Sequence, residues 1–152
     1  MNFEPKVTDR AAFVALWHNG ELLVLQSRKW QTEGTPYLLP GGGLKRPDEP
    51  LKSRVAVEFF EETGIALLKK ESLSFFGEHE TKWTKATFFE ADTKTAKCID
   101  GGGIEKIGNM NIEDKIFGHE WWNFEKDRKR IEALKPFMMP GLKWYLEQKG
   151  LL

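Results

Sequence analysis

The chain has 152 residues, of which 40% are hydrophobic and 30% are charged, and its formal net charge is zero. A chain of this length and composition can bury a core of its own, which excludes a largely disordered protein and indicates one globular domain over residues 1–152. Zero net charge excludes the broad basic surface that holds long nucleic acid, but it allows a local site for a small anionic ligand.

Cysteine content and hydropathy indicate the compartment. Cys98 is the only cysteine, so no disulfide can form within the chain, and a reducing environment is expected. The segment 1–10 lacks the apolar core of a signal peptide, and no apolar run reaches the roughly 18 residues of a membrane span. We therefore expect a cytoplasmic protein that does not act at a membrane.

A β-hairpin is predicted at the start of the chain. Residues 11–18 are apolar and rich in strand-forming types, and they are followed by Asn19-Gly20, the strongest short hairpin signal. Residues 21–28, ELLVLQSR, supply the partner strand. The segment TPYLLPGGG then predicts a short strand ended by Pro40 and three glycines, where the backbone can turn sharply or approach a ligand closely.

The pattern changes to that of a helix at Asp48, which is a candidate N-cap residue. Leu51, Val55 and Phe59 recur every four residues, as on the buried face of a helix. Gly64 is a typical C-cap residue and is expected to end this helix.

The second half of the chain predicts strands followed by helices. Alternating residues in LSFFGEHETKWTKATFFEAD predict two strands around a turn near Gly77 or Lys82. Residues 92–115 are polar and rich in glycine, so a long surface loop or insertion is expected there. HEWWNF predicts a short final strand, and residues 125–134 and 141–149 predict one or two closing helices.

Three glutamates gather near the C-terminal end of the predicted helix. At about 100° per residue, Glu61 and Glu62 fall within about 60° of Glu58, on one side of the helix. Carboxylates at a helix C-terminus are unfavourable by about 0.3 to 1 kcal/mol each, because that end carries partial negative charge. Oxygen ligands of this kind suit a hard cation such as Mg²⁺ or Mn²⁺, which would cancel the repulsion among the three carboxylates. From these residues alone, a solvated acidic face stays open as the alternative.

The wider segment GLKRPDEPLKSRVAVEFFEETGI, residues 43–65, resembles the signature box of the Nudix hydrolases. That box consists of Gly, five residues, Glu, seven residues, Arg-Glu, an aliphatic residue, any residue, Glu-Glu, any residue, Gly and an aliphatic residue. The matching positions are Gly43, Glu49, Glu58, Phe59, Glu61, Glu62, Gly64 and Ile65. The opening hairpin, the YLLPGG segment and HEWWNF are also arranged as in that family. The resemblance covers most of the chain and implies an α/β (α+β) fold, a Nudix-like α/β/α sandwich with a mixed β-sheet and the box loop and helix on one side.

The same resemblance implies a pyrophosphohydrolase that depends on Mg²⁺ or Mn²⁺. Such enzymes cleave a diphosphate bond in a nucleoside diphosphate-linked compound or a nucleoside triphosphate, by attack of water at phosphorus. By resemblance, Glu61 and Glu62 are metal ligands and Glu58 is a ligand or the base. The carbonyl of Gly42 or of Gly43 is a further expected ligand, and we favour Gly42.

In some members of the family, another glutamate that precedes a late tryptophan assists as ligand or base. Glu120 in HEWWNF matches that position and is expected to be catalytic. Glu105 and Glu113 are rival candidates from the segment 92–115. An ordinary charge at the edge of a strand is the alternative for Glu120.

The chain departs from the box at Val57, which replaces the Arg expected directly before Glu58. In the family that Arg pairs with the box carboxylates and orients them. Arg54 lies one turn earlier and can form an i,i+4 pair with Glu58, so it is a candidate replacement, with a surface role as the alternative. Together with Arg54, the residues expected to support the site are Glu49, Gly43 and Gly64.

Because this Arg is missing, a second function is possible besides hydrolysis. The chain would then be a catalytically weak or inactive regulatory module with the Nudix fold that binds a nucleotide. A third possibility is an interaction domain with an acidic surface helix. The expected partner is a small nucleotide-type diphosphate, and many members of the family are dimers, so a homodimer stays open. Residues 79–82, HETK, contain neither the Pro nor the Tyr found near this position in members that prefer ADP-ribose or dinucleoside polyphosphates. This favours a nucleoside triphosphate or another diphosphate.

Overall fold

The computed structural model describes residues 9–44, 48–63, 73–81, 84–93 and 116–152. Within these ranges the chain forms strands and helices in the order β1 (Asp9–His18), β2 (Glu21–Ser27), α1 (Arg28–Gln31), β3 (Tyr37–Leu38), β4 (Gly41–Gly43), α2 (Leu51–Thr63), β5 (Ser74–Glu80), β6 (Thr84–Asp92), β7 (Ile116–Trp122), α3 (Arg128–Ala133), the 3-10 helix η3 (Lys135–Phe137) and α4 (Pro140–Gln148).

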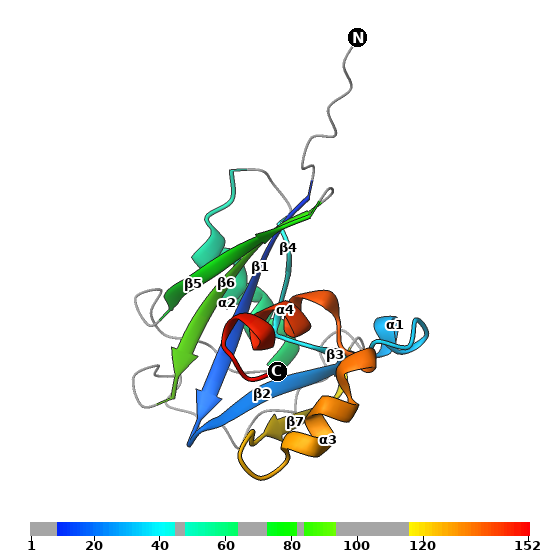
Figure 1. Ribbon diagram of the computed structural model, residues 1–152. Coiled ribbons are helices and arrows are strands. Elements are labelled where there is room, and N and C mark those ends of the chain that lie inside the picture. Colours follow the sequence, from blue (N-terminus) through cyan, green and yellow to red (C-terminus); the bar gives the residue numbers. More distant parts are fainter. Residues whose placement is uncertain (1–8, 45–47, 64–72, 82–83, 94–115) are drawn as a thin grey trace.

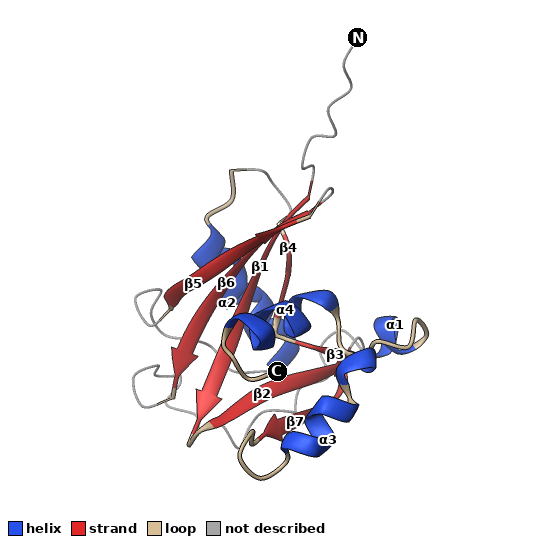
Figure 2. Cartoon of the chain, in the orientation of Figure 1, coloured by secondary structure: helices blue, strands red, loops and turns tan. Residues whose placement is uncertain are grey.

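The strands of the described part form one mixed sheet (Figures 1 and 2). Their order is β3-β2-β1-β6-β5, while β4 also pairs with β1 and β7 also pairs with β2. β1 and β6 run parallel, and the other pairs are antiparallel. None of the helices in the described ranges is both long enough and apolar enough to span a membrane.

The opening hairpin is confirmed, and its turn has a clear physical cause. β1 and β2 pair through Trp17 with Leu22 and His18 with Glu21, which leaves a two-residue turn. Asn19 has a φ of 51° and Gly20 has a φ of 79°. A two-residue turn of this kind needs positive φ at both positions, and Asn followed by Gly adopts it at low cost.

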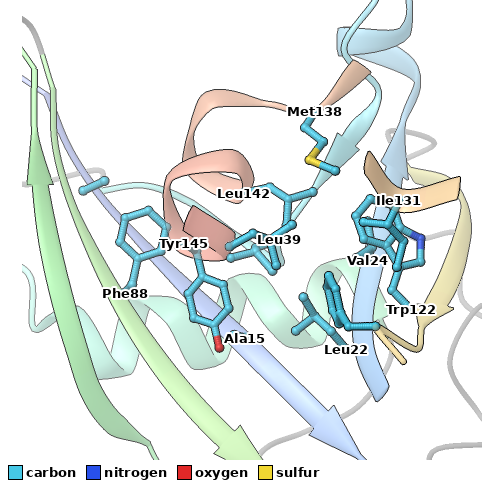
Figure 3. Close-up of a cluster of buried hydrophobic side chains, with 13 residues drawn as sticks. Ala15, Leu22, Val24, Leu39, Phe88, Trp122, Ile131, Met138, Leu142 and Tyr145 are labelled. Carbon is cyan, nitrogen blue, oxygen red and sulfur yellow. The ribbon is translucent and has the colours of Figure 1, made fainter. Parts of the chain in front are cut away.

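The sheet separates two hydrophobic layers, because successive side chains of a strand point to opposite faces. Ala12, Val14 and Leu16 of β1 pack with Val55 and Phe59 of α2 on one face. On the other face, Ala15 of β1 belongs to a cluster with residues of α3 and α4 (Figure 3). In Figure 1, α2 lies behind the sheet and α4 in front of it. The predicted α/β/α sandwich with a mixed sheet is therefore confirmed.

Several boundaries differ from the prediction. The three glycines form a strand of their own, β4, which pairs with β1, so they continue the sheet after Pro40. β5 ends at Glu80 and β6 begins at Thr84, so the two strands are connected between these residues and not at Gly77. Gly77 lies inside β5, at a register shift where Trp144 of α4 approaches closely.

The sequence reading also passed over the short helix α1, whose N-cap is Ser27. The predicted final strand begins three residues earlier than HEWWNF, at Ile116, and the closing helices are α3 and α4 with η3 between them. Gly64, the predicted C-cap, and most of the expected loop at 92–115 lie outside the described residues.

Candidate active site

A cavity of about 620 Å³ lies where the C-terminal half of α2, the glycine strand β4 and the start of α4 meet. Its walls differ in chemistry. Glu58, Glu61 and Glu62 line one part together with the three glycines of β4. Apolar residues, among them those at the start of α4, line much of the rest. The cavity therefore joins an acidic region to an apolar one.

The three glutamates come from the last two turns of α2, and each is half-buried. Phe59, between them in sequence, is fully buried in the core, so the helix face that carries the glutamates is fixed by packing. The backbone N–H of Gly41 donates a hydrogen bond of 2.9 Å to Oε1 of Glu62. This bond ties the end of α2 to the glycine strand.

The glycine strand is shaped by a residue that must lack a side chain. Gly41 has a φ of 145°, and a Cβ built on it would lie 2.2 Å from the carbonyl oxygen of Ala12. β4 can therefore approach β1 this closely only with glycine at position 41. A Cβ on Gly42 would lie 3.3 Å from the carboxyl carbon of Glu58, so this glycine leaves room for the carboxylate.

Arg54 connects the box loop, the glycine strand and α2. Its guanidinium pairs with the carboxylate of Glu58 through Nη2, and its Nε lies 3.4 Å from Oε1 of Glu49. The same Nε donates a hydrogen bond of 3.4 Å to the carbonyl oxygen of Gly43. The i,i+4 pair expected from the spacing is thus present. Val57, in contrast, is 47% exposed.

The donor set of the acidic region fits a hard divalent cation, because it consists of carboxylate oxygens beside backbone carbonyls. The side chains are nevertheless not gathered into a cation site. In the part of the chain that the structure describes, no three His, Cys, Asp or Glu side chains are close enough together to hold a metal ion. Gly42 lines the same cavity, so its expected role as a carbonyl ligand stays a prediction.

The apolar region of the cavity is built from segments that are far apart in sequence. Phe13 comes from β1, Trp30 from α1 and Met139 from the residue before α4. The ammonium group of Lys29 lies 4.9 Å from the centre of the Trp30 ring. His79 also lines the cavity, and its ring stacks on Trp144 with centroids 5.1 Å apart.

Sequence reasoning missed the start of α4, because no local motif marks residues that become neighbours only through the fold. Pro140, Gly141 and Leu142 all line the cavity. Trp30 of α1 lines the cavity as well.

Glu120 is not among the residues that line this cavity. It lies on β7 opposite Val24 of β2 and accepts hydrogen bonds from Gln26 at 3.0 Å and from Arg130 of α3 at 2.5 Å. The bond to Glu120 raises the pKa of Arg130, and burial, with Glu120 nearby, raises the pKa of Tyr37. Glu120 is thus part of a polar cluster beside α3 that is separate from the three glutamates of α2. Its rivals Glu105 and Glu113 lie outside the described residues.

No family model matches the sequence, and no curated protein matches it either. Solved structures do match. A Nudix hydrolase from Nitrosomonas europaea is 16% identical, with 92% of this chain and 86% of that chain covered and a TM-score of 0.59. A mutator MutT protein from Bacillus halodurans is 19% identical, with coverage of 91% and 80% and a TM-score of 0.54. The MutT protein from Methanosarcina mazei Go1 is 25% identical, with coverage of 77% and 78% and a TM-score of 0.50.

Proposed function

We propose that this chain, which has the fold of the Nudix hydrolase and MutT structures that it matches, is a hydrolase that cleaves a diphosphate bond in a nucleotide-type substrate. The observation that carries the proposal is the shared cavity, in which the three box glutamates and the glycine strand adjoin an apolar region. The first part suits a diphosphate with its counter-cation, and the second suits the group attached to it.

Glu58, Glu61 and Glu62, with the carbonyl of Gly42, are the groups that would hold Mg²⁺ or Mn²⁺. When bound, such a cation neutralises phosphate oxygens and makes water a better nucleophile at neutral pH. These carboxylates are otherwise repelled by the diphosphate, so they suit this substrate only together with a cation.

The residues of the chain position the reaction. The bond from Gly41 N–H holds the carboxylate of Glu62 in place, and Arg54 holds that of Glu58. Water attacks phosphorus, the bond to the bridging oxygen breaks, and a carboxylate oxygen of this region accepts the proton of the water. Enzymes lower the barrier of such reactions mainly by positioning the reacting groups and by neutralising the charge on the phosphate oxygens. The fixed carboxylates are therefore the main contribution of the protein.

The apolar region would bind the remainder of the substrate. Trp30 lines the cavity, and an aromatic ring offers a stacking surface that every nucleobase can use whatever its hydrogen-bonding pattern. This supports a nucleotide as the substrate class without selecting one base.

The experiment is Mg²⁺-dependent release of phosphate or pyrophosphate from nucleoside triphosphates, modified nucleotides, nucleotide sugars and dinucleotides. Glu62→Gln is compared with the wild type, and Glu132→Gln is the matched control, because Glu132 is an exposed carboxylate of α3 that pairs with Arg128. We expect turnover that is lost in Glu62→Gln and kept in Glu132→Gln. Turnover that survives in Glu62→Gln would refute this assignment of the site.

A second candidate function is nucleotide binding without cleavage, in a regulatory module. The observation that favours it is Val57 in place of the box Arg. Binding of a nucleotide by calorimetry, with no turnover of any compound in the panel, would establish this second function in place of the first.

A further inference from the structure

Arg54 is placed where three parts of the candidate site meet. Its side chain is only 10% exposed, and those of Glu49 and Glu58 are each 15% exposed. Its guanidinium contacts Glu49 from the box loop, Glu58 from α2 and the carbonyl of Gly43 from β4. A planar guanidinium with several donors can bridge such a set, whereas an ammonium group acts as a single point charge.

The contact with Glu58 has a consequence for cation binding. Arg54 occupies Oε1 of Glu58, which is one of the oxygens that a cation in the acidic region would need. The carboxylate also lies against Gly42, on the wall of the cavity.

We propose that Arg54 is a positioning residue that competes with a divalent cation for Glu58. Without the cation, the guanidinium holds the carboxylate between Glu49 and the glycine strand. A bound cation would compete with Arg54 for Glu58, and Arg54 would still limit where the carboxylate can move. The expected effect on turnover rests on the proposed function, whereas the expected effect on cation binding does not depend on it.

Removal of the positive charge has two opposite effects, and their combination is diagnostic. A cation meets less repulsion and no competitor at Glu58, so Mn²⁺ binds about tenfold more tightly or better in Arg54→Met. The carboxylate also loses its orientation, and loss of such an outer contact typically lowers activity by about 10- to 100-fold. Damage to the fold alone would lower affinity and turnover together.

The experiment measures Mn²⁺ affinity by electron paramagnetic resonance, and thermal unfolding with and without Mn²⁺, in wild type, Arg54→Met and Arg54→Lys. Arg128→Met is the matched control, because Arg128 forms another i,i+4 pair with a glutamate, exposed and on α3. We expect tighter Mn²⁺ binding and a larger Mn²⁺-induced rise in Tm for Arg54→Met. Arg54→Lys keeps the charge, so we expect its Mn²⁺ affinity within about threefold of wild type, with turnover reduced.

Unchanged or weaker Mn²⁺ binding in Arg54→Met would overturn the proposal, and so would the same tightening in Arg128→Met. If Arg54→Met does not fold without a cation, Arg54→Lys decides, since turnover equal to wild type would refute the positioning role. A wild type that binds Mn²⁺ but hydrolyses nothing refutes the proposed hydrolase function alone, because the affinities still test the competition.

Discussion

Replacement of Gly41 by alanine tests the glycine strand directly. At a φ of 145° an alanine is strained, and such a backbone state costs about 1 to 3 kcal/mol. The added Cβ would lie 2.2 Å from the carbonyl oxygen of Ala12 and 2.7 Å from Cα of Phe13, so β4 must move away from β1. That movement breaks the bond from Gly41 N–H to Glu62, and a hydrogen bond to a charged group contributes about 1.5 to 3 kcal/mol.

Together these effects predict a loss of about 3 to 6 kcal/mol in the free energy of unfolding. For a domain of this size that corresponds to a fall in Tm of roughly 6 to 24 °C. Urea unfolding followed by tryptophan fluorescence and by circular dichroism measures the loss, and an unchanged dependence on urea would show that the unfolding transition is still the same one.

The neighbouring glycines are the matched controls. A Cβ on Gly43 meets only the carbonyl oxygen of Arg10 at 3.8 Å, so Gly43→Ala is expected to be neutral or stabilising by about 0.4 to 1 kcal/mol. Gly42→Ala is expected to change stability little but to push the carboxylate of Glu58, which lies 3.3 Å from the new atom. A Gly41→Ala protein that melts within 2 °C of wild type, or a Gly43→Ala protein that loses as much, would refute the reasoning.

Two further predictions concern the two layers of the core. Phe59 is fully buried beneath the glutamates, so Phe59→Ala should lower the free energy of unfolding by about 3 to 5 kcal/mol, measurable in urea. The hydroxyl of Tyr145 accepts a hydrogen bond from Trp17 and donates one to Glu90, and burial, followed by the bond to Glu90, raises its pKa well above the usual 10. The unfolded tyrosine ionises above about pH 10 and the folded one does not, so this contribution to stability is complete below pH 10 and falls above it by up to about 1.4 kcal/mol per pH unit. In Tyr145→Phe the free energy of unfolding should fall less steeply with pH. If wild type and Tyr145→Phe lose free energy of unfolding equally steeply between pH 10 and 11, the role of the hydroxyl is contradicted.

Local signals in the sequence were sufficient for those elements whose causes are local. The turn at Asn19-Gly20 needs positive φ at two neighbouring residues, and the pattern Leu51, Val55, Phe59 needs only a helical period. The pairing of Arg54 with Glu58 also follows from helical spacing. These features could be predicted because each one depends on residues a few positions apart.

The rest of the site depends on distant parts of the chain. Glu120 matched a position in a motif, but its placement is decided by the pairing of β7 with β2 and by Arg130 of α3, which no local pattern reveals. The cavity wall at Pro140 and Gly141 has the same origin. The glycine strand could not be predicted either. Three consecutive glycines usually indicate a turn, and they form a strand here only because they pair with β1, which is distant in sequence.

The alternation of β1 between two packed layers bears on how this protein can change over time. Ala12, Val14 and Leu16 face the helix that carries the glutamates, while Ala15 faces the layer that includes α4. A substitution at the start of α4 therefore changes the apolar wall of the cavity without touching the side chains that pack behind the acidic residues. The two walls of the cavity are thus supported by opposite faces of the same sheet.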